Sequence, residues 1–249
     1  MNAKPKAKAS SKYTPKPTSS TPTYILGGIA LVVIAIVVIG GVIWQNNRDK
    51  PRNEGYGTVN NAAVQVQIQD EGAVRLGRPD AAVTVDLFED AMCPGCQQFE
   101  HLFGQEMAQA VDDGKLAIRY HMLDGLNQLS ASGDYSTRAA AATRCVAETG
   151  NAIAYNKFHV ALYADENKPE EKGKTDLSNE QLAQLAKDSG VADAGVQCIA
   201  SGAKAQEAAD GANESREVMA AAGAKVTPTA LLDGKIVDTA KADWIEKLG

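Results

Sequence analysis

The fold is decided by the stretch FEDAMCPGC at residues 88–96, in which two cysteines lie two residues apart directly after an apolar run. Residues 82–88 predict a central strand, and residues 96–112 carry apolar side chains at helical spacing. Residues 115–123 predict a further strand. The cysteine motif is therefore expected at the turn from strand to helix in a β–α–β unit.

That position favours redox chemistry at the two cysteines. At the start of a helix, unpaired backbone N–H groups and the positive end of the helix dipole face the Cys93 sulfur, which lowers the pKa of its thiol. Cys93 is therefore the expected nucleophile, and Cys96 lies further inside the helix. Pro94 is compatible with a first helical turn. We interpret Cys93 and Cys96 as a catalytic redox pair whose motif residues are Pro94 and Gly95.

Two other interpretations compete with a redox pair. Half of a zinc site would need a second cysteine or histidine pair, but Cys145 and Cys198 are isolated in the sequence. A structural staple is the other alternative, although so short a loop constrains the unfolded chain little. We expect neither a metal nor a prosthetic group.

The remaining chain surrounds this unit with one more strand, a helical segment and a hairpin. Residues 64–69 alternate between apolar and polar side chains, which predicts a strand. An Ala-rich helical insertion is expected at about 125–222, and a short helix is expected at 241–248. Strands at 229–232 and 235–237 flank Asp233-Gly234, a two-residue hairpin turn. The expected helices within the insertion are 135–149, 151–164, 179–189, 192–201 and 203–222.

The stretch KVTPT at residues 225–229, just before that hairpin, makes a family resemblance specific. A redox motif after a core strand, a helical insertion and Thr-Pro-Thr before a terminal hairpin together resemble the DsbA-like thiol–disulfide oxidoreductases of the thioredoxin superfamily, in their membrane-anchored bacterial form. The resemblance covers about residues 64–249. It implies that Pro228 is cis and faces the redox pair, and that Thr227 offers its backbone to a bound substrate. An ordinary trans proline in a turn is the alternative.

Gly95 departs from the pattern of this family. Its best-known oxidases have a histidine at this position, which stabilises the thiolate and makes the oxidised form reactive. The general reductases of the superfamily carry Gly-Pro, the reverse of Pro94-Gly95. The direction of the reaction therefore stays open at this point.

The other two cysteines and two acidic residues also carry expectations. Some members of the family have a second disulfide, and this resemblance, with the even number of cysteines, supports a structural Cys145–Cys198 bond; two buried free thiols are the alternative. Glu89 and Asp90 directly precede the motif; Glu89 is expected as a solvent-exposed loop carboxylate, and the direction of the Asp90 side chain stays open. A buried proton relay at Glu89, of the kind that this superfamily uses, is the other possibility.

The first 60 residues predict a membrane anchor. Residues 24–44 are uncharged and mostly aliphatic, and as a helix they would be about 31 Å long, close to the roughly 30 Å hydrocarbon core. Residues 1–23 hold five lysines and no acid, which favours a disordered cytoplasmic tail and an uncleaved signal anchor. Residues 45–60 form a linker, and residues 61–249 form the extracytoplasmic domain.

Charge and compartment complete the prediction. The formal net charge is −6, of which the tail contributes +5 and residues 45–56 contribute +1, so the chain from Gly57 onward carries −12. This argues against nucleic acid as a partner. The expected fold is α/β, thioredoxin-like with a helical insertion, preceded by one transmembrane helix. The expected function is oxidation of unfolded exported proteins, with re-oxidation by a quinone-linked membrane protein. An exported reductase or isomerase, or a tethered binding module without redox activity, is the alternative.

Overall fold

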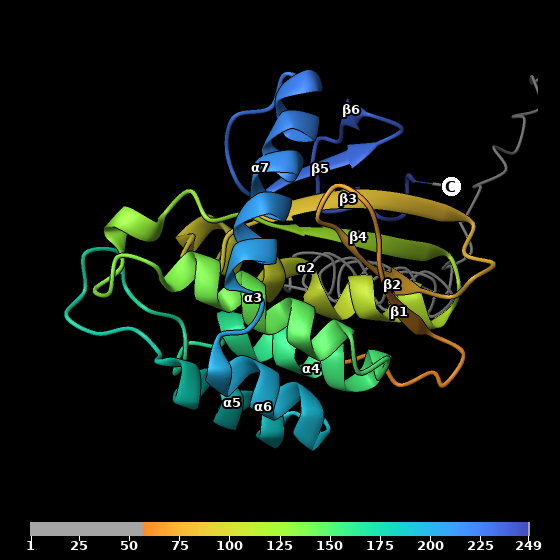
Figure 1. Cartoon of the computed structure of the whole chain (residues 1–249). Coiled ribbons are helices and arrows are strands. Elements are labelled where there is room, and N and C mark those ends of the chain that lie inside the picture. Colours follow the sequence, from red (N-terminus) through yellow and green to blue (C-terminus); the bar gives the residue numbers. More distant parts are fainter. Residues whose placement is uncertain (1–56, 249) are drawn as a thin grey trace, which may run out of the picture. The chain divides into compact units, whose positions relative to one another are not determined.

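The computed structural model describes residues 57–248. The predicted tail, the transmembrane segment 24–44 and most of the predicted linker lie outside these residues. Within residues 57–248, no helix is both long enough and apolar enough to cross a membrane. The described part folds around a six-stranded sheet in the order β1-β2-β4-β3-β5-β6 (Figure 1).

The centre of the sheet is the predicted β–α–β unit. Strand β3 (Val83–Glu89) pairs in parallel with β4 (Leu116–Met122), and helix α2 (Pro94–Asp112) connects them. The remaining strands, β1 (Gln65–Ile68), β2 (Val74–Gly77), β5 (Thr229–Leu232) and β6 (Lys235–Ile236), pair antiparallel with their neighbours. The prediction of these elements is confirmed, except for β2, which the sequence analysis missed.

Strand β3 is buried on both of its faces. Val85 and Leu87 belong to the main apolar core, which includes the inward side chains of α2. Phe88 points to the opposite face, where it packs in a second cluster with Met219 of α7 (Ala205–Ala221). A strand with apolar side chains on both faces must lie inside the sheet. This position fixes the residues that follow it, and hence the cysteine motif.

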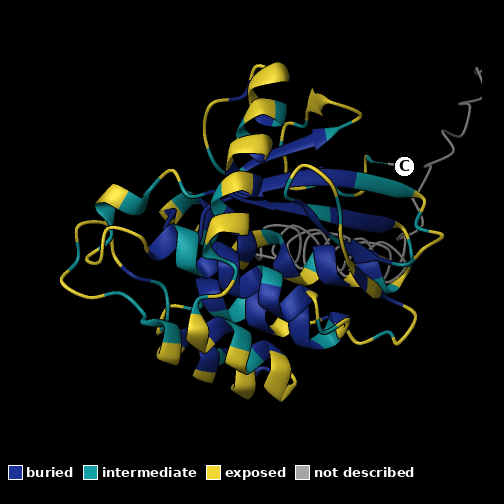
Figure 2. Ribbon diagram, viewed as in Figure 1, coloured by how far each residue is buried: buried dark blue, intermediate teal, exposed yellow. Residues whose placement is uncertain are grey.

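The helical insertion forms a layer on the sheet and extends away from it. It comprises a short 3₁₀ turn η1 (Asn127–Leu129) and the helices α3 (Tyr135–Ala147), α4 (Ala152–Tyr163), α5 (Asn179–Asp188), α6 (Asp193–Ser201) and α7. Figure 2 shows α3 and α4 largely buried, whereas α5 and α6 are exposed on their outer sides.

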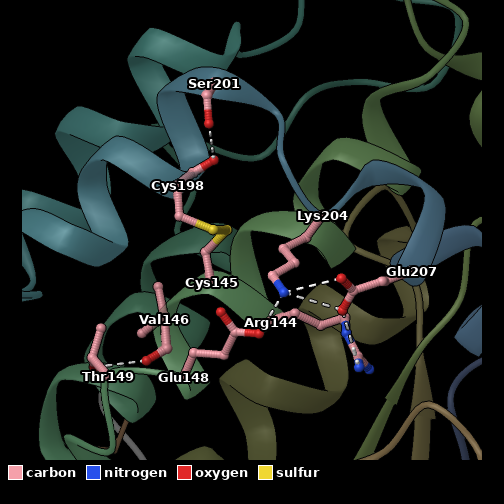
Figure 3. Close-up of a disulfide and its surroundings, with 9 residues drawn as sticks. All are labelled: Arg144, Cys145, Val146, Glu148, Thr149, Cys198, Ser201, Lys204 and Glu207. Atoms are coloured by element: carbon pink, nitrogen blue, oxygen red, sulfur yellow. Dashed lines mark hydrogen bonds and ion pairs between the residues drawn. A yellow bond between two sulfur atoms is a disulfide. The ribbon is translucent and has the colours of Figure 1, made fainter.

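A disulfide joins Cys145 of α3 to Cys198 of α6 (Figure 3). This is the bond that the family resemblance implied. Close packing accompanies it, because a Cβ added at Gly195 of α6 would lie 2.7 Å from the Val191 side chain and 2.8 Å from that of Thr149. The outer helix α6 is therefore attached to the layer beneath it by a covalent bond and by tight contacts.

At the C-terminal end of the described chain the structure has turns in place of the predicted helix, and at its N-terminal end the chain is packed against the domain. The predicted helix at 241–248 is wrong: these residues form successive turns with hydrogen bonds such as Trp244 N to Lys241 O, 3.1 Å. At the other end, Val59 is fully buried and its N–H donates to Asn156 Oδ1 at 2.8 Å. The chain thus joins the body of the domain by residue 57, beside the middle of α2.

A buried polar network connects the sheet to α7. Asp86 of β3 accepts hydrogen bonds from Arg119 at 2.6 Å and from His121 Nε2 at 2.9 Å. His121 Nδ1 lies 2.9 Å from Ser215 Oγ of α7, and that hydroxyl donates to the Glu71 carbonyl at 2.7 Å. Because α7 leads directly into residues 222–228, this network helps to position the loop that faces the cysteines.

Candidate active site

The two motif cysteines occupy the first turn of α2 with very different exposure. Cys93 is the N-cap residue, with an extended backbone, and Pro94 is the first helical residue. Cys93 retains 8% of its surface exposed, whereas Cys96 retains none. Both are free thiols in this structure. A thiol from another protein would therefore reach the sulfur of Cys93 and not that of Cys96.

The surroundings separate the acidities of the two thiols. The pKa of Cys93 is lowered to about 5, first by a hydrogen bond from the Cys96 thiol and further by a hydrogen bond from the Thr227 side chain and by the backbone N–H groups of Cys96 and Gly95, although burial acts in the opposite direction. Burial raises the pKa of Cys96 well above its ordinary value, and the neighbouring Cys93 and Glu89 raise it further. At neutral pH Cys93 is thus a thiolate and Cys96 a thiol.

The loop before β5 lies directly against this pair. The Thr227–Pro228 peptide bond is cis, as the resemblance implied. The Thr227 carbonyl oxygen lies 3.6 Å from Cys93 Sγ. A Cβ at Gly95 would approach Pro228 Cδ to 3.2 Å, so the absence of a side chain at position 95 matches the closeness of this loop.

Asp90, whose orientation the sequence left open, is buried and holds the turn that presents the cysteines. Its carboxylate accepts hydrogen bonds from the Met92 N–H at 2.9 Å, the Ser136 hydroxyl at 2.7 Å and the Leu126 N–H at 3.0 Å. Burial raises the pKa of Asp90 to about 6, although these three donors act in the opposite direction. The side chain joins the motif to α3 and to the segment after β4.

Glu89 is also fully buried, at the end of β3, so the exposure expected for it is wrong. Its carboxylate lies 3.2 Å from His159 Nε2 of α4, and that nitrogen lies 3.3 Å from Glu100 Oε1 of α2. Burial, and then the charge of Glu100, raise the pKa of Glu89 to about 8. Burial disfavours the charged imidazole of His159, but the two carboxylates outweigh it and raise its pKa to about 9. The cluster can therefore hold and release a proton beneath Cys96.

The same three side chains are the set within the described residues whose spacing would suit a metal ion, with ligand atoms within 4.8 Å of one another. The imidazole nitrogen points between both carboxylates at hydrogen-bonding distances, and the ring of Tyr120 packs on His159 with its centroid at 4.2 Å. An imidazole nitrogen that is hydrogen-bonded to Glu100 and faces the carboxylate of Glu89 accounts for this geometry, so we interpret the cluster as a proton-holding ion pair.

The structure brings together the cysteines, Pro94, Gly95, Thr227 and Pro228, and it keeps the second disulfide apart in the helical layer. Sequence reasoning missed the participation of Glu100 and His159. A signal for Glu100 was present, because it lies four residues after Cys96 and so on the same inward face of α2. No comparable signal marked His159.

A thioredoxin-like α/β fold with a thiolate–thiol pair at the first turn of its central helix defines a thiol–disulfide oxidoreductase. The chain belongs to the thioredoxin family, because the sequence profile of the family described as thioredoxin matches residues 69–247. Within that family it is a DsbA-like protein-disulfide oxidoreductase, as its similarity to solved structures shows.

DsbA from Mycobacterium tuberculosis is 30% identical, with a TM-score of 0.59 over 71% of this chain and 93% of that one. The disulfide bond oxidoreductase DsbG of the same organism is 30% identical, with a TM-score of 0.60 over 72% and 90%. MdbA, a thiol-disulfide oxidoreductase from Corynebacterium diphtheriae, shares the fold at 22% identity, with a TM-score of 0.67 over 78% and 97%.

A curated relative is much longer than this chain. The serine/threonine-protein kinase PknE of Mycobacterium tuberculosis is 33% identical over 186 residues, which is 75% of this chain. The match covers 33% of the kinase, so the chain spans about a third of the length of this relative.

Proposed function

We propose that this chain oxidises cysteine pairs of unfolded exported proteins, with Cys93 and Cys96 as the catalytic pair. The observation that carries the proposal is the strongly stabilised thiolate of Cys93, whose pKa is lowered to about 5. Stabilising the reduced form of a dithiol makes its disulfide a stronger oxidant, and an ordinary reductase such as thioredoxin has a nucleophile with a pKa of about 7. The lowered pKa therefore favours the oxidising direction.

The reaction begins with a Cys93–Cys96 disulfide. A substrate thiolate attacks the Cys93 sulfur, a mixed disulfide forms, and Cys96 leaves as a thiolate that takes up a proton. A second substrate thiolate then attacks the substrate sulfur of the mixed disulfide, and Cys93 leaves as its stabilised thiolate. The substrate loses two electrons, and the pair gains them. An oxidant must then restore the disulfide, and we assign this step to a membrane protein that passes the electrons to a quinone.

The buried cluster of Glu89, Glu100 and His159 and the loop before β5 have separate roles in this reaction. The charge of Glu89 raises the pKa of Cys96. The Glu89 carboxyl supplies or removes the proton of Cys96 through its ion pair with His159. Thr227 and Pro228 face Cys93 and would bind the backbone of the substrate strand beside it. No prosthetic group is needed, because thiol–disulfide exchange moves the electrons directly between sulfurs.

The location that fits this activity is the outer face of a cell membrane. We propose residues 1–23 as the cytoplasmic tail, 24–44 as the single membrane span and 45–60 as a linker whose last residues, from Gly57, are held on the domain. The Cys145–Cys198 disulfide supports an oxidising compartment. If the domain from residue 61 is outside, protease added to intact cells will digest it; protection from the protease would contradict this arrangement.

One observation favours the reverse direction as a second candidate. Gly95 contributes no side chain where the strongly oxidising members of the family have histidine, so the pair could serve an exported reductase or isomerase. The reduction potential of the Cys93–Cys96 pair separates the two directions.

The potential is measured on the full-length chain equilibrated in glutathione buffers, with Cys145→Ala/Cys198→Ala as the control that reports only on the catalytic pair. A value of about −120 to −180 mV places the protein with the oxidising enzymes, and this is the expected result. A value near about −270 mV would place it with the reductases and contradict the oxidase proposal. Cys93→Ser is expected to abolish exchange in either direction.

A further inference from the structure

We propose that Val226, the second residue before the cis proline, determines which client cysteines this enzyme prefers, because its exposed side chain contacts an apolar residue next to the client cysteine. The inference rests on the proposed function and deepens it, since it names a specificity-determining residue beside Cys93. The preferred clients are then unfolded segments in which a large apolar side chain directly adjoins the reactive cysteine.

The exposure of Val226 is high for an apolar residue of this domain. Val226 is 70% exposed, whereas the other exposed large apolar residues of the described chain, Ile236, Leu102 and Ile68, are 55%, 38% and 36% exposed. Isolated apolar residues are common on protein surfaces, so exposure alone does not mark a site. Val226 differs from the other three because the next residue in the chain, Thr227, contacts the reactive sulfur.

The backbone on both sides of Val226 is anchored. Ala224 is buried, and its N–H donates to the carbonyl of Met219, near the end of α7, at 3.1 Å. The Val226 carbonyl accepts a hydrogen bond from the Thr229 hydroxyl at 2.6 Å, and Thr229 begins β5. The loop therefore holds the Val226 side chain at the surface, where no other part of the domain covers it.

Two separate segments place an exposed apolar residue next to the reactive sulfur. The Thr227 carbonyl oxygen lies 3.6 Å from Cys93 Sγ, so Val226 is one residue away from this contact. In the redox motif itself, Pro94 follows Cys93 directly and is exposed as well. A client segment that reaches Cys93 must therefore pass along apolar surface of both the loop and the motif.

The geometry of paired strands indicates which client residue meets Val226. A client strand that binds the backbone at Thr227 directs its cysteine toward Cys93. Successive side chains of a strand alternate between its faces, and residues directly opposite each other in paired strands have their side chains on the same face. The client residue opposite Val226 is thus a direct neighbour of the client cysteine, and an apolar side chain there removes the surface of Val226 from water.

The test measures the preference of the full-length chain between two dithiol peptides, in which either leucine or serine flanks each cysteine. Oxidised glutathione regenerates the enzyme disulfide, and the direct reaction between peptide and glutathione is subtracted. We expect the parent to oxidise the leucine peptide with a kcat/KM about three- to tenfold higher than that of the serine peptide. Val226→Ser should remove most of this preference, and Val226→Leu should retain it.

The matched control is Ile236→Ser, which removes an exposed apolar side chain from β6. Ile236 pairs with Leu231, four positions beyond Thr227, so this variant should keep the preference of the parent. A parent that oxidises both peptides equally well would overturn the inference, as would a preference that persists in Val226→Ser or is lost equally in Ile236→Ser. Because each comparison is a ratio within one variant, a change in overall activity does not affect it.

Failure of the proposed function gives a different result. A parent that oxidises neither peptide but reduces their disulfide forms with reduced glutathione would contradict the oxidase proposal. The same preference is then read from the two rates of reduction, since exchange at Cys93 passes through the same mixed disulfide in both directions. Val226→Thr, which has nearly the shape of the parent residue, provides a second polar variant if Val226→Ser does not fold.

Discussion

The disulfide of the helical layer allows a quantitative prediction. The bond closes a loop of about 54 residues, since Cys145 and Cys198 are 53 positions apart. By the loop-entropy relation, cross-linking such a loop raises the free energy of unfolding by about 4 kcal/mol, because it restricts the unfolded chain. The surface ion pairs around the bond, in which Lys204 contacts Glu148 and Glu207 (Figure 3), add little.

The perturbation is Cys145→Ala/Cys198→Ala, which is preferable to a reducing agent because reduction would also open the catalytic pair. The tight contacts around Gly195 remain, so we expect a folded protein whose free energy of unfolding is lower by about 4 kcal/mol. For a domain of this size the midpoint of thermal unfolding should fall by roughly 8–16 °C.

The assay is urea unfolding followed by fluorescence, to which the buried Trp244 contributes. The matched control is Cys93→Ala/Cys96→Ala, which also removes two cysteines but opens only a four-residue loop and should change stability much less. A loss below about 1 kcal/mol in Cys145→Ala/Cys198→Ala would refute the reasoning. It would mean that packing alone already restricts this part of the unfolded chain.

Two further substitutions test the buried charges. Glu89→Gln should slow the steps that transfer the proton of Cys96 by about 100-fold near pH 7 while leaving the alkylation of Cys93 unchanged, and an unaltered pH–rate profile would count against a relay. The pKa of Glu89 in the folded protein is about 8, above its ordinary value of 4.5. The unfolded chain therefore loses this proton at a lower pH than the folded protein, and the free energy of unfolding decreases as pH rises between these values. Glu89→Gln should flatten that part of the stability curve. Asp86→Asn should reduce the free energy of unfolding by about 3 kcal/mol in urea titrations, because it leaves Arg119 and His121 without their buried partner. Burial opposes the charge of Asp86, but hydrogen bonds from His121 and Arg119 outweigh it and keep its pKa below 3.8, so this contribution should persist at neutral pH and disappear only as pH falls below about 4.

The central part of the fold could be predicted because its signals are local. The apolar run of β3, the helical spacing after Cys96 and the Asp233-Gly234 turn each specify an element within a few residues of themselves. The turn has positive φ at both positions, 50° and 73°, as a two-residue hairpin of this kind requires. The order of the cysteine motif and the Thr-Pro-Thr stretch then identified the site.

What the sequence analysis missed depends on contacts between distant segments. Strand β2 has only four residues, with Arg75 among them, and it exists because β1 and β4 pair with it on either side. The burial of Glu89 depends on His159, which is 70 positions away in the sequence but 3.2 Å away in space. Local propensity carries no information about such a pair.

The described chain begins against the redox helix itself. Gly57 fits against the backbone of Gly104 and Gln105, which are eleven and twelve residues along the chain from Cys93. At 1.5 Å per residue, the part of α2 between the Gly57 contact and the reactive sulfur is roughly 18 Å long. The packing of Gly57 against Gly104 and Gln105 thus keeps the entry point of the chain at a fixed distance from the reactive sulfur.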